Sequence, residues 1–205
     1  MGILLTAVPV SAQDRLIQSF ELTPFIGGRF GGTLEIQPES GPEVRASLRD
    51  ATSYGVSAGV RFDDLSMIEF SWTRARSTLR FEPVVNPLAA PLGNVTLDQF
   101  HGDFSREFVL EDLKTLRPYL TASVGATHFG AVNDGFTRFS FGFGTGLKLL
   151  LNSKFGLRFQ AQWLPIWVDP EVRGLACGSG SGCIVVLSGK LIEQFQVSVG
   201  PVFRF

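Results

Sequence analysis

The chain has 205 residues, with 18 Lys or Arg against 19 Asp or Glu, so its formal net charge is −1. This balance lacks the basic excess of a nucleic-acid-binding domain and the acidic run of a disordered tail. Gly and Phe are abundant, at 23 and 19 residues, whereas Cys and His number 2 each. The composition argues against a disulfide-dense miniprotein, and a four-ligand zinc site would need every Cys and His. We expect no metal, no cofactor and no nucleic-acid partner.

The first residues predict a truncated signal peptide. Residues 3–10 are largely apolar and Val10-Ser11-Ala12 has the small residues of a cleavage site, although the basic segment of a complete signal is missing. The alternative is a hydrophobic strand or tail. We expect residues 1–12 to be the signal and residues 13–205 to form one exported domain. No uncharged run is long and apolar enough for a transmembrane helix.

Hydrophobicity alternates with a period of two along the rest of the chain, which is typical of β-strands with two different faces. Between Phe20 and Ile36 the even positions carry no charge, whereas Glu21, Arg29 and Glu35 occupy odd positions. The alternation recurs down the chain. It predicts eight strands, at residues 20–36, 51–62, 66–81, 95–108, 117–129, 138–150, 154–166 and 189–205.

The connections between these strands alternate in length. Short ones are expected at Asp63-Asp64, where the two acids suit a turn better than a metal site, and at 109–116 and 151–154. An even number of antiparallel strands with short turns at one end and long loops at the other is typical of membrane β-barrels. The predicted long loops are residues 37–50, 82–94, 130–137 and 167–188.

Alternation alone does not say which face points inward, since a soluble barrel of the lipocalin type would bury its apolar face. Three features favour an apolar outside. Gly residues lie mainly on the polar face, where a narrow barrel has least room, and the predicted signal implies export. Phe residues next to the termini or short turns would form one interfacial girdle. They are Phe20, Phe62, Phe108, Phe155, Phe203 and Phe205.

The last eight residues read SVGPVFRF, with a Gly and then aromatic residues at the antepenultimate and final positions. This segment resembles the β-signal of bacterial outer-membrane proteins, and the strand pattern of residues 19–205 is similar to the OmpA/OmpX-like eight-stranded family. The resemblance implies an all-β, eight-stranded antiparallel up-and-down transmembrane β-barrel, here the barrel domain only. It also implies that the barrel-assembly machinery reads Gly200, Phe203 and Phe205.

The resemblance further implies a monomer in the outer membrane of a Gram-negative cell envelope, with both termini in the periplasm. The partners of the protein would be outer-membrane lipid and lipopolysaccharide. Arg45 and Arg49 in the first long loop could bind lipopolysaccharide phosphates, and the alternative is that they belong to an ordinary solvated loop. Pro24 and Pro201 depart from the pattern, since each removes a ladder donor from a terminal strand. We expect a bulge or a bound water near them, where these two strands close the barrel.

The polar face would fill the lumen with charges, which must pair because an unpaired buried charge costs several kcal/mol. We expect a plug of ion pairs and glutamines, with Glu69 and Arg158 at similar depth. A gated ion or proton path through the same residues is the alternative. The predicted lumen charge network consists of Glu21, Arg29, Arg61, Glu69, Asp103, Glu107, Lys148, Arg158 and Arg204.

No catalytic site is predicted. His101, Asp103 and Ser105 share one strand face, but neighbours at this spacing diverge from the geometry of a catalytic triad. His128 is not followed by the Ser that lipid-A-modifying barrels carry after a rim His. Three Gly residues at 142, 144 and 146 have strand spacing, which does not fit a dinucleotide-binding loop.

Cys177 and Cys183 bracket the segment GSGSG in the longest predicted loop. An exported protein meets an oxidising compartment, so the sequence predicts a disulfide between them. Its function would be to stiffen an exposed loop.

The leading functional hypothesis is a non-enzymatic membrane scaffold or surface-interaction protein that presents four extracellular loops on a barrel with a plugged polar lumen. Eight strands enclose an interior only wide enough for side chains, so no open pore is expected. The alternative is a narrow, porin-like channel for a small or apolar solute. A third hypothesis, less favoured by the residues, is an outer-membrane lipid-modifying enzyme.

Overall fold

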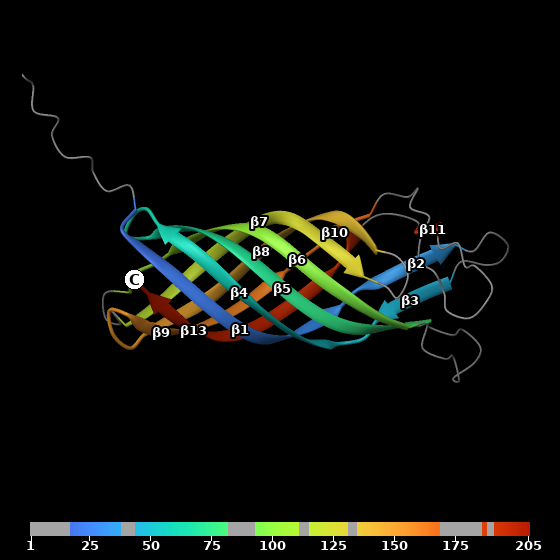
Figure 1. Ribbon diagram of the computed structural model, residues 1–205, viewed down its shortest axis with the longest axis horizontal. Helices are drawn as coiled ribbons and strands as arrows, with labels where there is room; N and C mark the ends of the chain where they lie inside the picture. Colours follow the sequence, from blue (N-terminus) through green and yellow to red (C-terminus); the bar gives the residue numbers. More distant parts are fainter. Residues whose placement is uncertain are drawn as a thin grey trace, which may run out of the picture.

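The computed structural model describes residues 17–37, 44–81, 93–110, 115–130, 135–168, 186–187 and 191–205. These residues form one antiparallel sheet that closes on itself as a barrel (Figure 1). The strands are β1 (Ser19–Gly31), β2 (Thr33–Gln37), β3 (Val44–Leu48), β4 (Ala51–Arg61), β5 (Ser66–Phe81), β6 (Gly93–Glu107), β7 (Leu116–Gly130), β8 (Gly135–Leu150), β9 (Phe155–Trp163), β10 (Ile166–Trp167), β11 (Val186–Leu187), β12 (Leu191–Ile192) and β13 (Gln194–Arg204).

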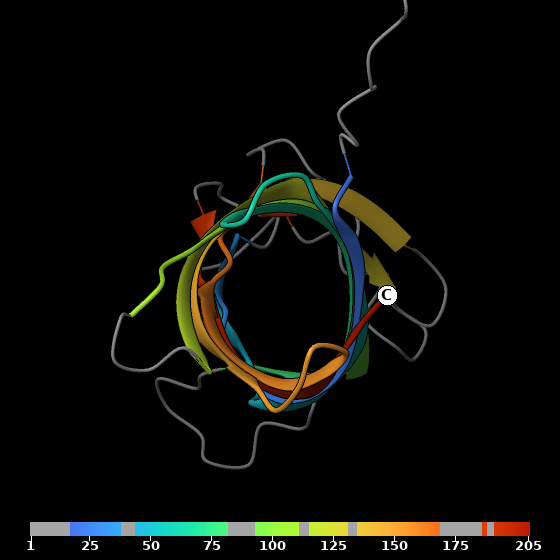
Figure 2. The same cartoon turned by 90° about the vertical axis from the view of Figure 1, so that its left-hand side faces the viewer.

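Short interruptions divide some of the eight barrel strands, so that β1 continues as β2, β3 as β4, β9 as β10 and β12 as β13. Each barrel strand pairs with its neighbours in the sequence, and β1 pairs with β13 to close the ring (Figure 2). At the seam, Phe20 and Phe205 exchange backbone hydrogen bonds of 2.9 and 3.1 Å. The predicted eight-stranded up-and-down topology is therefore confirmed.

In the part of the chain that the structure describes, no helix has the length and hydrophobicity needed to cross a membrane.

The apolar face of every barrel strand points outward and the polar face points into the lumen. Phe70 and Phe143 on the outside are 58% and 57% exposed, whereas Glu107 and Lys148 inside are 1% and 0% exposed. A water-soluble monomer rarely exposes so continuous an apolar surface. An apolar band around a polar interior is the arrangement that a barrel in hydrocarbon requires.

Glycines on the inner wall make room for large side chains. A Cβ atom on Gly146 would collide with the backbone oxygen of Phe159 and the hydroxyl of Tyr119, and one on Gly125 with the backbone oxygen of Phe100 and the ring of His101. By contrast, a Cβ on the outward-facing Gly102 would meet no heavy atom closer than 3.8 Å. The wall glycines therefore allow both a close approach of the neighbouring backbone and room for large lumen side chains.

Both ends of the described chain lie at the same end of the barrel as the short turns (Figure 1). The Asp63 carboxylate accepts hydrogen bonds from the backbone N–H groups of Leu65 (2.7 Å) and Ser66 (2.6 Å). The bond from Leu65 lowers the pKa of the Asp63 carboxyl. Asn152 closes the turn before β9 in the same way, with bonds of 2.8 Å from the N–H groups of Lys154 and Phe155.

The Phe residues of the predicted girdle are found at this end. Phe155 is half-buried, and its ring centroid lies 5.6 Å from that of Phe203. The others are exposed on the outer surface: Phe20, Phe62, Phe108, Phe203 and Phe205.

Two predicted loops are shorter than the sequence suggested. β7 extends to Gly130 and β8 begins at Gly135, where the sequence predicted a loop over 130–137. The rings of Phe129 and Phe136 stack there at 4.8 Å, which keeps the pairing intact to its last residues. In the predicted loop 37–50, β3 pairs with β2 and β5, because ladder bonds on both sides form a strand despite the polar sequence.

Of the two features predicted at the closure seam, the bulge is wrong, whereas the bound water stays a prediction. Leu22 pairs with Phe203 and Ile26 pairs with Val199, so the register is the same on both sides of the prolines. In that register Pro24 stands opposite Pro201. Since neither proline has an N–H to donate, the ladder opens locally without shifting, and both prolines stay paired on their other sides.

Candidate functional site

The lumen side chains form three layers, which we call the short-turn, middle and loop-side layers. In the short-turn layer, two carboxylates are surrounded by cations. Glu21 accepts from Arg61 (2.9 Å), Lys148 (2.6 Å) and Arg204 (2.6 Å). Glu107 accepts from Arg61 (2.5 Å), Lys148 (2.8 Å) and Arg117 (3.3 Å). Both acids are thus bridged by the same two buried cations.

The middle layer is centred on one ion pair, between Arg158 of β9 and Glu69 of β5, with 2.5 Å between Nη1 and Oε1. Glu69 also accepts from the hydroxyls of Ser57 (2.6 Å) and Ser105 (3.1 Å). Arg158 donates from Nε to the hydroxyl of Tyr119 (2.7 Å) and stacks 4.8 Å from its ring centre. Every charged group of this pair therefore has hydrogen bonds beyond its ionic partner.

The Arg158–Glu69 pair spans the lumen. Counting around the ring, β9 and β5 lie four barrel strands apart, the largest separation that eight strands allow. Lys148 of β8 likewise reaches Glu21 of β1 across the β9 and β13 strands. These contacts join opposite walls, so they obstruct the interior as well as pairing charges.

The loop-side layer contains neutral side chains around one guanidinium. Arg29 donates to the side-chain oxygens of Gln99 (2.5 Å), Gln196 (2.5 Å) and Gln194 (3.5 Å). From Gln99 a chain of polar groups continues across the wall. Gln99 donates to Thr127 (3.0 Å), Thr127 to Ser140 (2.9 Å), and Ser140 lies 2.7 Å from Nε2 of His101.

Seven residues of the predicted network make ion pairs in the structure, and two do not. Arg29 has no ion pair with any described residue, and neither has Asp103. Asp103 accepts from Ser71 (2.5 Å), and among the described residues its buried Oδ1 atom makes no hydrogen bond of ordinary geometry. The paired residues are Glu21, Arg61, Glu69, Glu107, Lys148, Arg158 and Arg204. Alternation assigns a residue to the lumen but does not give its depth along the barrel axis. Arg29 and Asp103 face the lumen as predicted, but neither lies within ion-pairing distance of an opposite charge among the described residues.

The side chains of His101, Asp103 and Ser105 make separate hydrogen bonds. His101 contacts Ser140, whereas Ser105 contacts Glu69 and Thr121. The three groups are therefore not arranged as a nucleophile, a base and an orienting acid. Among the residues the structure describes, no three His, Cys, Asp or Glu side chains converge as a metal site.

Sequence reasoning missed Arg117 as a member of the short-turn layer and missed a polar cluster on the outer wall. Arg117 is at an odd position, like Tyr119, so the alternation of that strand could have identified it. In the outer cluster Arg74 donates to Asp98 (2.7 and 2.9 Å), and Trp72 donates to Asp98 (3.2 Å). Arg74 and Asp98 occupy even positions, which belong to the otherwise apolar outer face. Two opposite charges on that face near the loop-side strand ends could have indicated the cluster.

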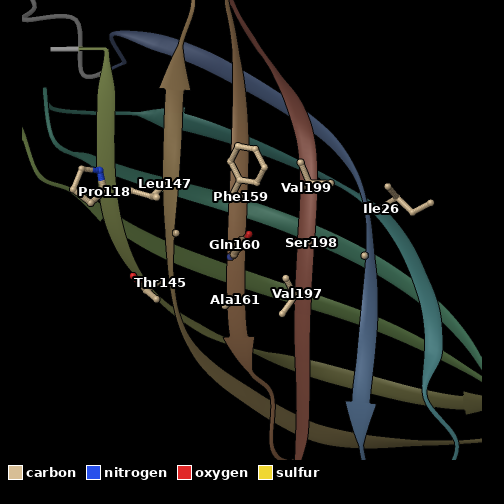
Figure 3. Close-up of a pocket in the computed structure, with 12 residues that line it drawn as sticks. Ile26, Pro118, Thr145, Leu147, Phe159, Gln160, Ala161, Val197, Ser198 and Val199 are labelled. Atoms are coloured by element: carbon tan, nitrogen blue, oxygen red, sulfur yellow. The ribbon is translucent and has the colours of Figure 1, made fainter. Parts of the chain in front are cut away.

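A groove of about 610 Å³ lies on the outer wall across β7, β8, β9, β13 and β1. Figure 3 shows Phe159 between Leu147 on one side and Val199 on the other, with the smaller Thr145 and Ala161 beside them. The side chains that line it are mostly outward-facing and apolar. The groove therefore faces the surroundings of the barrel and is not part of the lumen.

The remaining predicted residues are placed as follows. Gly200 lies on the inner wall beside Pro24 and Phe25, and Phe203 and Phe205 are exposed at the short-turn end. Arg49 is exposed, which fits both a solvated loop residue and a phosphate-binding one, and His128 contacts Thr137 at 3.0 Å. Residues 1–12, Cys177 and Cys183 lie outside the described residues.

No protein-family model and no curated protein sequence matches the chain. Its fold matches solved structures. The outer membrane protein OprG from Pseudomonas aeruginosa is similar with a TM-score of 0.65 and 11% identity, covering 91% of this chain and 95% of that one.

The outer membrane protein AlkL gives a TM-score of 0.62 and 14% identity over 98% of this chain and 97% of its own. Neisserial surface protein A gives a TM-score of 0.54 and 16% identity, over 91% of this chain and 97% of its own. At such low identities these matches establish the fold. The chain has the fold of the small eight-stranded outer-membrane β-barrels, the OmpA/OmpX-like architecture that its sequence predicts.

Proposed function

We propose that the chain is an integral protein of the bacterial outer membrane whose closed barrel acts as a scaffold for surface-exposed loops. The apolar outer band supports insertion in lipid, and the outer groove of about 610 Å³ would pack against acyl chains. The short-turn end, where the described chain begins and ends, would face the periplasm. The connections at the other end would face outward and contact lipopolysaccharide or a surface partner.

The observation that carries the scaffold proposal is the set of ion pairs that join opposite walls. Arg158 and Glu69 lie at most 5% exposed, and Lys148 with Glu21 at most 1%. Opening a path through them would leave charges unpaired in a narrow, poorly hydrated space, which costs several kcal/mol. Such a barrel is suited to rigid support, and its loops would carry the specific interactions.

The scaffold proposal is tested by single-channel recording on the refolded protein in planar bilayers. We expect a closed barrel with at most rare, small conductance steps. The double variant Glu69→Ala/Arg158→Ala, which removes the pair that spans the lumen, should conduct more often if it folds. Steady, porin-sized conductance of the natural chain that no lumen substitution abolishes would favour the narrow-channel alternative.

The orientation is tested by inserting an epitope within residues 82–92 and, as a control, between Asp63 and Asp64. Antibody should reach the first insertion on intact cells and the second only after the outer membrane is opened. The reverse labelling would contradict the proposed orientation. Mass spectrometry of lipid A from expressing cells tests the remaining alternative, a lipid-modifying enzyme, for which we expect no change.

We also propose that Gly200, Phe203 and Phe205 act as an assembly signal. Deleting Phe205 should lower the yield of protein in the outer membrane much more than it lowers the stability of barrel refolded in detergent. An unchanged membrane yield would contradict this function of the terminal residue.

A further inference from the structure

The loop-side layer holds a buried cation that has no acidic partner in the described part of the chain. Arg29 is 3% exposed, and its guanidinium donates to the amide oxygens of Gln99, Gln194 and Gln196. Its Nε–H is also buried and has no hydrogen-bond partner among the residues that the structure describes. The layer therefore combines an unmatched positive charge with an unused donor.

Neutral amides solvate this charge but do not cancel it. A buried charge without a counter-charge is unfavourable, and a guanidinium does not lose its proton in a protein. The charge of Arg29 must therefore be balanced by an anion, or else remain as a cost to the fold. The short-turn layer shows the contrast, since each of its buried cations contacts two carboxylates.

Asp103 does not supply the missing counter-charge. It lies four residues beyond Gln99 on β6, which places their Cα atoms about 13 Å apart, and His101 stands between them on the same face. A carboxyl group can also be neutralised by binding a proton, whereas Arg29 has no such route. The unmatched charges of Arg29 and Asp103 are therefore independent of each other, and the charge of Arg29 can be cancelled only by an added anion.

The side chains around Arg29 have the donors that an anion needs. Each of the three glutamines carries an NH₂ group besides the oxygen that faces Arg29, and rotating a terminal amide exchanges the two. The hydroxyls of Thr127 and Ser140 continue the layer and can reorient their O–H groups. If an anion lay beside Nε–H, these glutamine amides could rotate so that their NH₂ groups donate to the anion, whereas their oxygens now accept from the guanidinium.

We propose that the loop-side layer binds one small monovalent anion, a halide or the carboxylate group of a small solute, beside the Nε–H of Arg29. The single unmatched charge sets the valence of the anion. The enclosed position of Nε limits the size of the anion, because it must fit among the buried side chains that surround the guanidinium. This site goes beyond the scaffold function, since a closed barrel could hold such an ion without conducting it.

The direct test is a ¹H–¹⁵N NMR titration of the refolded protein in detergent micelles. The Arg29 Nε–H resonance is assigned by its loss in the Arg29→Gln variant. At constant ionic strength, sodium gluconate is replaced by sodium chloride, formate or butyrate. We expect the Arg29 resonance to shift saturably with chloride or formate. The Arg74 Nε–H, which already donates to Asp98 at 2.7 Å, serves as the control that should not shift.

A saturable shift with chloride alone supports a halide site, and one that persists with formate and butyrate supports a site for a solute carboxylate. The midpoint of urea unfolding provides a second measurement. It should rise in chloride relative to gluconate for the natural chain and for Arg74→Gln, but not for Arg29→Gln. No saturable shift with any of the three anions, or an unchanged anion dependence in Arg29→Gln, would overturn the proposal.

Discussion

The two halves of the lumen solve the problem of buried polarity in different ways. In the short-turn and middle layers, ion pairs such as Arg158–Glu69 match cations with carboxylates from opposite walls. In the loop-side layer, Arg29 is surrounded by three glutamines and no described carboxylate. The first half gains a closed, cross-linked interior. The second half keeps an unmatched buried charge. Because such a charge lowers the stability of the fold, stability alone does not explain why it is present.

The largest expected effect comes from breaking the pair that spans the lumen. Glu69→Ala would leave Arg158 buried without its counter-charge, so the free energy of unfolding should fall by about 3–5 kcal/mol. Urea unfolding in detergent micelles or bilayers measures this loss. A loss below about 1 kcal/mol would mean that water or another group compensates Arg158, and the matched half would not differ from the loop-side half.

An intermediate effect is expected when the inner wall loses the space that a glycine provides. In Gly146→Ala the new methyl would meet the backbone oxygen of Phe159 and the Tyr119 hydroxyl, which bonds Arg158, so overpacking should cost about 1–3 kcal/mol. The matched control is Gly102→Ala on the open outer face, where the change should stay within about 0.5 kcal/mol. Equal effects in both variants would show that the wall has spare room.

A smaller effect is expected for Arg29→Gln, although Arg29 is as buried as Arg158. The substitution removes hydrogen bonds from a charged donor, worth about 1.5–3 kcal/mol each. It also removes a buried charge that lacks a partner, whose burial costs a comparable several kcal/mol. In buffer without small anions, the free energy of unfolding should therefore be nearly unchanged or slightly higher. If Arg29→Gln destabilises the barrel as much as Glu69→Ala does, Arg29 has a counter-charge that the described residues do not include.

The smallest effect is expected at the turn after β4. The backbone N–H bonds to Asp63 lower the pKa of its carboxyl, so the stabilisation they add is present above the unfolded pKa of about 3.9. It is lost as the pH falls through the lower folded value. Asp63→Ala should slightly lower the urea midpoint at pH 7 and leave it unchanged at strongly acidic pH. If the difference in urea midpoint between the natural chain and Asp63→Ala grew toward acidic pH, the proposed effect of the Asp63 carboxylate would be contradicted.

Much of this architecture could be predicted from alternation along the chain. A period of two assigns Glu69 and Arg158 to one face and Phe70 and Phe159 to the other, and the glycines on the polar face indicate which side is inside. The predicted similar depth of Glu69 and Arg158 is confirmed by their ion pair. The other partners within the lumen are harder to predict. They depend on strand tilt and stagger around the closed ring, which bring β9 and β5 side chains to one depth but leave Arg29 and Asp103 apart.

Two local features, the arrangement of the seam prolines and the length of β7 and β8, could not be predicted from the sequence. The seam prolines signalled lost donors, but only the register shows that Pro24 and Pro201 stand opposite each other, so that one gap absorbs both losses. The strand extension to Gly130 and Gly135 is accompanied by stacking of Phe129, the last residue of a predicted strand, on Phe136, which the pattern assigned to a loop. In both cases the deciding contact lies between two strands.

The central claim, that the lumen is closed by charge pairing across its diameter, is tested most directly by a double-mutant cycle on Glu69→Gln and Arg158→Gln. Urea unfolding of the natural chain, the two single variants and the double variant gives the coupling free energy of the pair. The double variant should be much more stable than the sum of the single losses predicts, with a coupling toward the upper end of about 0.5–3 kcal/mol. Losses that add to within about 0.3–0.5 kcal/mol would contradict the claim, because independent sites behave in that way.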